Sequence, residues 1–333
     1  MRESGNAIIQ NLGEPLRGGD IMNRCVAVTG SCGFLGRYVT ERLLDRGDWV
    51  YAVDALTYAA DPDLPLLWQE VYPGGRFKFV CRDINELGAW PEVDAVINLA
   101  AETHVCNSIE SSGRFMATNI LGVHHLLEMT RARAHNGMPT FVQISTDEVY
   151  GDIHTGETDE DAPFNPSSPY AASKASGDAL VLAWGRTFGV PYRIIRPSNC
   201  YGAHQYPEKL IPKAVRRLVL GQPIPIHGDG SAERSWLWVE DCADAILTVL
   251  DKGTDGEVYN VPGNTILSVA EVARQIIAAF GGGQMQTGFE RPGLDRRYCV
   301  TGHKLGPLGW QPKGYFPRDL PGIVKREQET MRW

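Results

Sequence analysis

Short runs of apolar and β-branched residues recur through the first part of the chain, separated by longer segments with helical spacing. Several runs are apolar throughout rather than alternating, so we expect strands that are buried on both faces, as in a parallel sheet. The predicted strands are 25–29, 49–53, 77–80, 95–99, 140–144 and 192–195, and the predicted helices are about 34–46, 111–136 and 168–187. This alternation predicts an α/β fold, a Rossmann-type doubly wound parallel sheet.

The pattern changes after about residue 197, where proline and glycine interrupt the chain more often. Helices are predicted near 208–220, 240–251 and 268–280, with short extended pieces between them. We therefore predict an N-terminal extension at 1–23, a Rossmann domain at 24–197, and a smaller C-terminal substrate-binding lobe at 198–333. The lobe is expected over the carboxyl edge of the sheet, where such folds bind ligands. The segment at about 239–261 could belong to either part.

Composition narrows the class of partner. A net charge of −8 and isolated basic doublets argue against a nucleic acid or an anionic membrane surface. No apolar run approaches the roughly 20 residues of a membrane span, and residues 1–22 lack the apolar core of a signal peptide. The seven cysteines are scattered, without a Cys-x-x-Cys pair, which argues against a disulfide framework or a zinc site. We expect a cytoplasmic protein with no metal.

The first predicted strand leads into a loop with glycines at positions 30, 33 and 36, followed by a predicted helix. Glycines in this context allow a tight turn and a close approach of the backbone to a pyrophosphate, which the helix N-terminus then stabilises. Asp54 ends the next strand, 24 residues after Gly30. A carboxylate there accepts hydrogen bonds from ribose hydroxyls and repels a 2′-phosphate, so the expected cofactor is NAD rather than NADP. The alternative is an ordinary tight turn, with Asp54 capping a helix.

Tyr170 and Lys174 form a Tyr-x-x-x-Lys pair on a helix that Ser168 can cap and Pro169 can begin. A spacing of four places the phenol and the ammonium on one face of the helix. A nearby ammonium stabilises phenolate, which would lower the tyrosine pKa from about 10. Tyr170 is thus a candidate base for a hydroxyl proton while hydride leaves for a nicotinamide.

Two adjacent carboxylates, Asp147 and Glu148, follow the strand predicted at 140–144. By themselves they could be a solvated turn. Close carboxylates do not both ionise easily, so one can stay protonated and act as an acid while the other acts as a base. An acid and a base are what the elimination of water requires.

Together these residues resemble the extended short-chain dehydrogenase/reductases, and among them the dTDP-glucose 4,6-dehydratases. The likeness covers about residues 24–333. It is carried by Thr146–Gly151, Ser168–Ser176, Tyr206–Pro212 and Arg291–Tyr298. The resemblance implies a nucleotide-sugar 4,6-dehydratase, a hydro-lyase that forms a 4-keto-6-deoxy sugar through an internal NAD⁺/NADH cycle. dTDP-glucose, or a related nucleotide hexose such as UDP-glucose, would be the substrate.

The resemblance also implies roles for particular residues. Tyr170, with Lys174, would deprotonate the 4-hydroxyl, Thr146 would hold that oxygen, Glu148 would remove the C5 proton, and Asp147 would protonate the leaving 6-hydroxyl. The NAD site would comprise Gly30, Gly33, Phe34, Leu35, Gly36, Asp54, Ala55, Leu56, Thr57, Asp83, Ile84, Leu99, Ala100, Ala101, Thr118, Ser145, Tyr170, Lys174 and Cys200. The nucleotide sugar would be held by Thr103, Asn199, Lys209, Leu210, Pro225, Ile226, His227, Arg234, Asn260 and Arg291.

The chain departs from the usual family pattern at Cys106-Asn107, Cys200, Ser235 and Leu294, none of which removes a catalytic group. A nucleotide-sugar 4-epimerase or decarboxylase would share the tyrosine and lysine but would not need the adjacent carboxylates. A non-catalytic NAD-binding regulator is a further alternative, since a fold does not fix a function. The resemblance also implies a homodimer through the helices predicted at 111–136 and 168–187.

Overall fold

The computed structural model describes residues 23–289 and 291–330, so the predicted N-terminal extension lies outside it except for Asn23. A seven-stranded sheet forms the centre of the molecule, and all of its neighbouring strands are parallel. In spatial order the strands are β10 (Glu257–Val261), β6 (Tyr192–Pro197), β5 (Thr140–Ile144), β4 (Ala95–Asn98), β1 (Cys25–Thr29), β2 (Trp49–Asp54) and β3 (Phe77–Cys81).

The order of these strands reverses between β1 and β4. From β1 the chain proceeds to β2 and β3 on one side, then returns through β4 to β5 and β6 on the other. This is a doubly wound sheet, and the predicted Rossmann-type fold is confirmed. In such sheets ligands bind outside the carboxyl ends of the strands, at the point of reversal.

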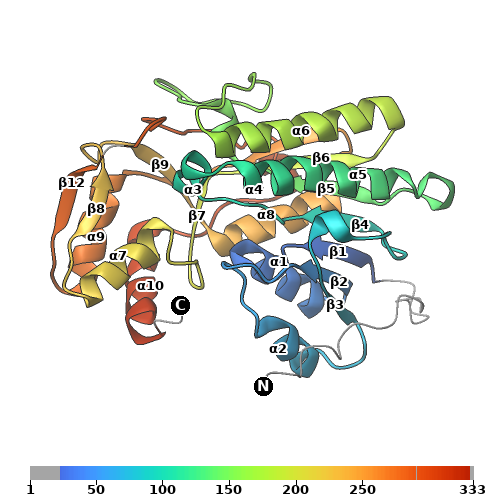
Figure 1. The fold of residues 1–333 in the computed structure, drawn as a ribbon, viewed down its shortest axis with the longest axis horizontal. Helices are drawn as coiled ribbons and strands as arrows, with labels where there is room; N and C mark the ends of the chain where they lie inside the picture. The colour runs from blue at the N-terminus through green and yellow to red at the C-terminus, as the bar shows by residue number, and fades with distance from the viewer. Residues whose placement is uncertain (1–22, 290, 331–333) are drawn as a thin grey trace.

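Helices cover both faces of the sheet (Figure 1). One face packs on α1 (Phe34–Asp45), α2 (Leu64–Val71) and α8 (Val239–Lys252), and the other packs on α5 (Val123–Arg131) and α6 (Pro169–Phe188). Alternate residues of β1 serve the two layers: Val26 and Val28 belong to the first core, and Cys25 and Ala27 to the second. Burial on both sides explains why β1 is apolar at every position.

The helix predicted at 111–136 is not continuous. It consists of α4 (Gly113–Met116), a π-helical segment η2 (Ala117–Gly122), α5, and a 3₁₀ turn η3 (Ala134–Asn136). The wide turn lies around Asn119, which is buried and bonded outside its own helix. Its side chain accepts from Glu102 N at 3.0 Å and donates to Ser173 Oγ at 2.8 Å. Such π-helical turns are frequently found at functional sites.

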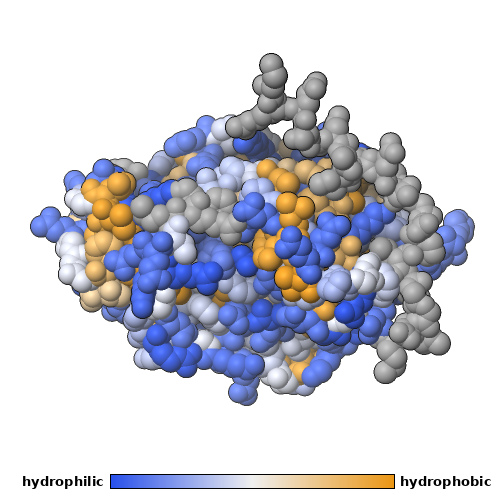
Figure 2. Space-filling view, turned by 90° about the horizontal axis from the view of Figure 1, so that it is seen from below, coloured by the Kyte–Doolittle hydropathy of each residue, from blue (hydrophilic) through white to orange (hydrophobic). Residues whose placement is uncertain are grey.

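The structure also contains helices that the sequence pattern does not predict, α2, α3 (Val105–Glu110) and α10 (Phe316–Thr330). Helix α2 is apolar on all sides: Leu64 and Trp68 are buried, whereas Leu66, Leu67 and Val71 are exposed. Figure 2 shows apolar side chains gathered on the surface that carries α2. Because apolar side chains occupy exposed as well as buried positions, and only Gln69 and Glu70 are polar, the segment lacks the clear separation of apolar and polar faces that marks a surface helix.

Most of the C-terminal part forms a smaller lobe beside the sheet. It has a three-stranded sheet of β11 (Thr265–Ser268), β9 (Glu233–Trp238) and β7 (Asn199–Tyr201), and a strand pair of β12 (Met285–Phe289) and β8 (Ile224–His227). Helices α7 (Leu210–Val219), α9 (Val269–Phe280) and α10 pack with them around a separate apolar core. Strand β10 and helix α8, in contrast, pack with the seven-stranded sheet.

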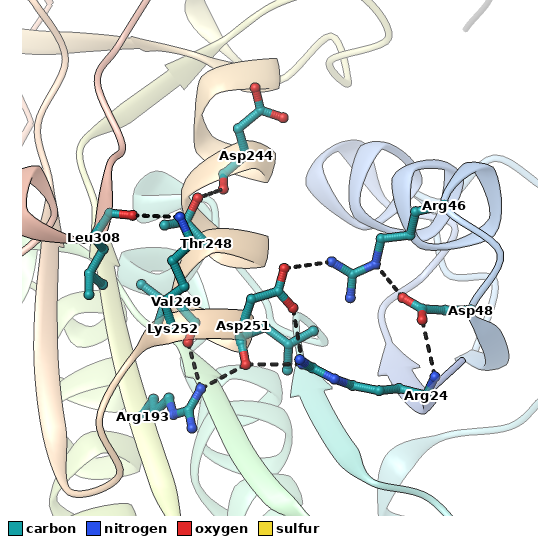
Figure 3. Close-up of polar contacts among 11 residues, drawn as sticks. Arg24, Arg46, Asp48, Arg193, Asp244, Thr248, Val249, Asp251, Lys252 and Leu308 are labelled. Atoms are coloured by element: carbon teal, nitrogen blue, oxygen red, sulfur yellow. Dashed lines mark hydrogen bonds and ion pairs between the residues drawn. The ribbon is translucent and has the colours of Figure 1, made fainter. Parts of the chain in front are cut away.

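A polar network lies at the amino ends of the central strands (Figure 3). Arg24 and Arg46 both pair with Asp251 near the end of α8, at 3.0 and 2.9 Å. Arg193 donates to the carbonyl oxygens of Val249 and Leu250, at 2.6 and 2.8 Å. Arginines at a helix C-terminus satisfy its last carbonyl groups and complement its dipole. The network therefore joins α8 to β1, α1 and β6 at the end of the sheet away from the carboxyl ends of its strands.

Candidate active site

A cavity of about 340 Å³ opens at the carboxyl ends of β1, β2, β4, β5 and β6. Its wall begins with the glycine loop after β1 and includes Asp54 at the end of β2. It continues through Leu99 after β4 and the segment from Ser145 to Glu148 after β5. Tyr170 and Lys174 of α6 complete one side. Side chains predicted from widely separated motifs thus meet in one place.

The glycine loop is tightly packed beneath the cavity. Gly30 has a φ of +67°, and a Cβ atom there would lie 2.7 Å from the backbone nitrogen of Ala100. A Cβ atom on Gly36 would lie 1.9 Å from the carbonyl oxygen of Gly30. No side chain caps the N-terminus of α1, where Gly33 is the capping residue. The helix therefore begins at the cavity with backbone N–H groups available for an anion, which fits a pyrophosphate.

Asp54 is buried and its carboxylate is held by two backbone N–H groups. It accepts from Cys32 N and from Leu56 N, each at 2.8 Å. Burial raises the pKa of Asp54, and the two hydrogen bonds oppose that shift. Each oxygen has a further lone pair for a ligand hydroxyl, as expected of a residue that binds ribose. The carboxylate joins strand β2 to the glycine loop rather than capping a helix.

Tyr170 and Lys174 lie on the first turns of α6. The predicted cap is present, because Ser168 Oγ accepts from Ala171 N at 3.1 Å and Pro169 is the first helical residue. Lys174 donates to the carbonyl oxygen of Ile144 at 2.6 Å, and burial lowers its pKa to about 8. Burial, then the charge of Glu148, raises the pKa of Tyr170, while a hydrogen bond with Thr146 lowers it. This is the reverse of the shift expected from Lys174, whose ammonium is directed at a carbonyl group.

The two carboxylates follow β5 on a 3₁₀ turn, η4 (Asp147–Tyr150), which Thr146 caps through Glu148 N at 3.3 Å. Asp147 is almost fully buried. Burial and the charge of Glu148 raise its pKa to about 7, so at neutral pH its proton is readily given and regained. Burial also raises the pKa of Glu148, against the lowering effect of Arg234. Asp147, which is buried, and Glu148, which is half-buried, therefore both line the cavity and do not form a solvated turn.

Three basic side chains act on Glu148 from the lobe side. Arg234 on β9, Lys209 before α7, and Arg291 each lower its pKa. Lys209 donates to the carbonyl oxygen of Thr103 at 2.8 Å, and Arg234 lies with its guanidinium 4.3 Å from the ring centre of Tyr298. Within the described residues, Arg291 Nε and His227 Nδ1 are buried without a hydrogen-bond partner. Cationic and orphaned polar groups of this kind fit an anionic, hydrogen-bonding ligand.

Every residue predicted for the cofactor lines this cavity except Leu56, whose backbone has a φ of +50° and only donates to Asp54. Of the residues predicted for the sugar nucleotide, Thr103, Asn199 and Lys209 line it. The others lie away from its wall: Leu210, Pro225, Ile226, His227, Arg234, Asn260 and Arg291. Asn260 is fully buried in β10, where its side-chain oxygen accepts from the Tyr150 hydroxyl at 2.8 Å. Its amide is committed to the protein interior.

Sequence reasoning missed a contact across the mouth of the cavity. The Tyr58 hydroxyl bonds to Glu102 at 3.3 Å and also contacts Glu208. The ring of Tyr58 packs edge-on against Tyr206, with centres 5.3 Å apart. These residues come from three loops far apart in the sequence, so no local spacing reveals them. His104, also near the cavity, accepts from Asn107 N and caps α3, which is a structural role.

Two features are absent from the described part of the chain. Residues 23–289 and 291–330 contain no cluster of three or more histidine, cysteine or acidic side chains that could hold a metal ion. None of the described helices is both long and apolar enough to cross a bilayer.

Fold and site define an enzyme with a dinucleotide-binding domain and a general acid–base centre. The model of the NAD dependent epimerase/dehydratase family matches residues 26–262, and the chain belongs to that family. The chain is 41% identical over 306 residues to the low-salt glycan biosynthesis protein Agl12 of Haloferax volcanii, covering 90% of this chain and 97% of the relative. It is 40% identical over 329 residues to the dTDP-glucose 4,6-dehydratase of Haemophilus influenzae, covering 90% and 96%.

A solved structure is similar over nearly the whole fold. The dTDP-glucose 4,6-dehydratase DesIV of Streptomyces venezuelae, solved with NAD bound, superposes with a TM-score of 0.86 at 35% identity. The match covers 93% of this chain and 98% of that one. The family predicted from the sequence is thereby confirmed.

Proposed function

We propose that this protein is a nucleotide-sugar 4,6-dehydratase, a hydro-lyase that converts dTDP-glucose or a related nucleotide hexose to the 4-keto-6-deoxy sugar and water. The observation that carries the proposal is the pair of carboxyl groups beside Tyr170, with Asp147 buried and Glu148 half-buried. Oxidation at C4 alone, as in an epimerase, needs the tyrosine but not two further acid–base groups. Elimination of water needs both.

NAD fits the cavity, and when bound it supplies a hydride acceptor whose reduced form gives the hydride back. The glycine loop offers backbone approach and helix N–H groups to its pyrophosphate, because side chains would fill that space. Asp54 has the position and charge to bind the ribose hydroxyls. The cavity wall that these residues form is continuous with Tyr170 and Glu148, so the reacting ring would lie against the catalytic groups.

In the oxidation, Tyr170 removes the proton of the sugar 4-hydroxyl. Thr146, which is hydrogen-bonded to Tyr170, holds the same oxygen. When Lys174 is protonated, it places a positive charge close to Tyr170 and Thr146. Its ammonium group is held by a hydrogen bond to the carbonyl oxygen of Ile144. Positive charge nearby lowers the pKa of the tyrosine, so that more of it is present as the phenolate that can accept the proton.

In the elimination, Glu148 removes the C5 proton, which the 4-keto group acidifies. Asp147, with a pKa of about 7, protonates the departing 6-hydroxyl so that it leaves as water. The two carboxyl groups are neighbours in the sequence, and ionisation of one makes ionisation of the other less favourable. The pair is therefore expected to hold a single proton. Lys209, Arg234 and Arg291 would hold the diphosphate, and Asn199 the sugar.

The proposal also includes the assembly, the location and the domain division of the protein. A homodimer through the helices predicted at 111–136 and 168–187 is supported by exposed apolar side chains, with Leu121 of η2 60% exposed and Phe188 at the end of α6 41% exposed. A cytoplasmic location is supported by seven cysteines that are all free thiols. The division into a cofactor domain at 24–197 and a substrate lobe at 198–333 is also a proposal, with β10 and α8 joined to the first part.

Mass spectrometry of dTDP-glucose and UDP-glucose, each incubated with the purified protein, tests the function. We expect one of them to lose the mass of one water without added NAD, because the cofactor is regenerated in each cycle. An epimerase would leave the mass unchanged, and a decarboxylase would act on a uronate instead. Bound NAD with no turnover of any nucleotide hexose would favour the non-catalytic regulator.

A further inference from the structure

Behind the catalytic carboxylates lies a hydrogen-bonded chain that the reaction does not use directly. Tyr150 is the last residue of η4, the turn that carries Asp147 and Glu148. Its hydroxyl accepts from Arg196 at 2.7 Å and donates to Asn260 Oδ1 at 2.8 Å. Arg196 is on β6 and Asn260 on β10. One hydroxyl thus attaches the turn to two strands of the central sheet.

The direction of these bonds is determined by their surroundings. Asn260 Nδ2 faces the carbonyl oxygen of Thr158 at 3.5 Å, so its Oδ1 is the atom turned to Tyr150 and can only accept. A guanidinium can only donate. The Tyr150 hydroxyl is therefore committed on both sides, with its single hydrogen directed to Asn260.

The other end of the chain is a buried ion pair on the catalytic helix. Arg196 Nε donates to Asp178 at 2.9 Å, and the two side chains are 2% and 0% exposed. Asp178 is on α6, one helical turn beyond Lys174. The guanidinium also lies 4.9 Å from the ring centre of Tyr150. A buried pair of this kind does not reorganise cheaply, because either charge left alone would be strongly unfavourable.

The catalytic carboxylates themselves have few side-chain contacts. Asp147 is 3.3 Å from Thr146 Oγ1 and also interacts with Ser198, and Glu148 is 3.5 Å from the Tyr298 hydroxyl. Their positions therefore depend on the backbone of η4. That backbone ends at Gly151, where φ is +72° and a Cβ atom would lie 2.1 Å from the carbonyl oxygen of Asn165. The short side-chain hydrogen bonds between this turn and the central strands are those of Tyr150, at 2.7 and 2.8 Å.

We propose that Tyr150 is a positioning residue. Through Arg196, Asp178 and Asn260, it fixes the position of the turn that carries Asp147 and Glu148 relative to Tyr170 and Lys174 on α6. The inference rests on the proposed function. In this proposal the hydrogen bonds of Tyr150 affect only one step of the reaction. The turn must be placed correctly for elimination, whereas oxidation at C4 depends on α6. Loss of the hydroxyl would leave oxidation in place and delay the removal of water.

The test compares Tyr150→Phe with Tyr259→Phe in a single turnover of the holoenzyme with dTDP-glucose. Tyr259 is an equally buried tyrosine on β10, whose hydroxyl accepts from Thr254 N at 2.8 Å and has no link to η4. Absorbance of reduced nicotinamide reports oxidation, and mass spectrometry reports water loss. For Tyr150→Phe we expect oxidation within about threefold of wild type and water loss slower by about 10- to 100-fold, since small misplacements of catalytic groups have effects of this size. Reduced nicotinamide then accumulates. Tyr259→Phe should resemble wild type in both steps.

Equal slowing of the two steps in Tyr150→Phe, or no change in either, would overturn the positioning role. If that variant does not fold, Arg196→Lys decides, because it keeps a positive charge for Asp178 but offers one nitrogen in place of the two that bond Asp178 and Tyr150. The same accumulation of reduced nicotinamide is expected, and its absence counts against the proposal. A wild-type protein that fails to dehydrate any nucleotide hexose contradicts the proposed function instead, so the two failures are distinct.

Discussion

The carboxylate of Asp54 accepts a hydrogen bond from the backbone N–H of Cys32 across 2.8 Å. The end of β2 is thereby bonded directly to the glycine loop that follows β1. A ligand that contacts Asp54 and the loop together meets two groups whose relative position is already established. Such preorganisation reduces the conformational freedom lost on binding.

Replacement of Asp54 by alanine should therefore weaken the binding of NAD in two ways. It removes the carboxylate that accepts hydrogen bonds from the ribose, and it frees the glycine loop from the end of β2. We expect affinity to fall by about 10- to 100-fold, as for a hydrogen bond to a charged group. Preference over NADP should also decline. Titration calorimetry with both cofactors measures this, with Asp54→Asn as the matched variant that keeps the size and one acceptor. Unchanged affinity and preference would remove Asp54 from the cofactor site.

Gly36→Ala should abolish NAD retention and lower the thermal midpoint, because the added Cβ would lie 1.9 Å from the Gly30 carbonyl oxygen. Overpacking of this kind costs about 1–3 kcal/mol. Gly88→Ala is the control, since nothing lies within 4 Å of a Cβ atom there. Thermal melts and the absorbance of copurified cofactor provide the readouts. A Gly36→Ala protein that binds NAD normally would show that the loop relaxes easily.

Tyr170→Phe should prevent both reduced nicotinamide and product from forming, because the first proton transfer has no acceptor. The ring and its contact with Phe115, at 6.4 Å between centres, are retained. A loss of about 10²- to 10⁴-fold is typical for a general base. Rapid-mixing absorbance with nucleotide sugar measures the first step. Appreciable oxidation in this variant would assign the proton to another group.

Glu148→Gln should block elimination while it leaves oxidation partly intact. The amide keeps the shape of the side chain but cannot accept the C5 proton. Exchange of the C5 hydrogen with deuterated solvent should disappear, and the 4-keto sugar should accumulate with reduced cofactor. Asp147→Asn is the informative partner, because it should preserve that exchange and still prevent water loss. Normal turnover by Glu148→Gln would exclude this residue as the base.

The rate of elimination should depend on pH through Asp147, whose pKa is raised to about 7 by burial and by the charge of Glu148. The protonated form of Asp147 is the acid, so the rate should fall about tenfold per pH unit above that pKa. At low pH the rate should fall again, because Glu148, whose pKa burial also raises, takes up a proton and no longer acts as the base. Lys174, with a pKa of about 8, loses its charge in the next interval above neutrality, which should slow the preceding oxidation. Removal of the Glu148 charge in Glu148→Gln should lower the pKa of Asp147. Single-turnover water loss across pH tests the profile, and a rate that rises above neutrality would contradict it.

The sheet could be predicted from the sequence because buried parallel strands are apolar at every position, as in Val26, Ala27 and Val28 of β1. Helix α6 could be predicted because Ser168 and Pro169 mark its start. Helix α10 could not, since it contains Pro321. Helix α2 lacked periodicity because Leu66 and Leu67 are exposed.

The candidate site divides in a similar way. Residues directly after strands, such as Asp54 and Asp147, are placed by the fold itself, since the carboxyl ends of parallel strands share one edge. Contacts between distant loops, such as Tyr58 with Glu102, have no signature in local spacing. The family resemblance implies that Asn260 holds the nucleotide sugar, whereas in β10 its side-chain oxygen accepts a hydrogen bond from Tyr150.

Because of the π-helical segment at Ala117–Gly122, the position of residues at the cavity depends on the number of residues in this helix. A π-helical turn holds about one residue more than an α-helical turn. Deletion of a single residue here would let the segment become an ordinary α-helix and remove the wide turn that carries Asn119. Thr118 would leave the cavity, and Asn119 would lose Glu102 and Ser173 together. We expect insertions and deletions to be tolerated far better in the neighbouring turn at Ala134–Asn136 than in these six positions.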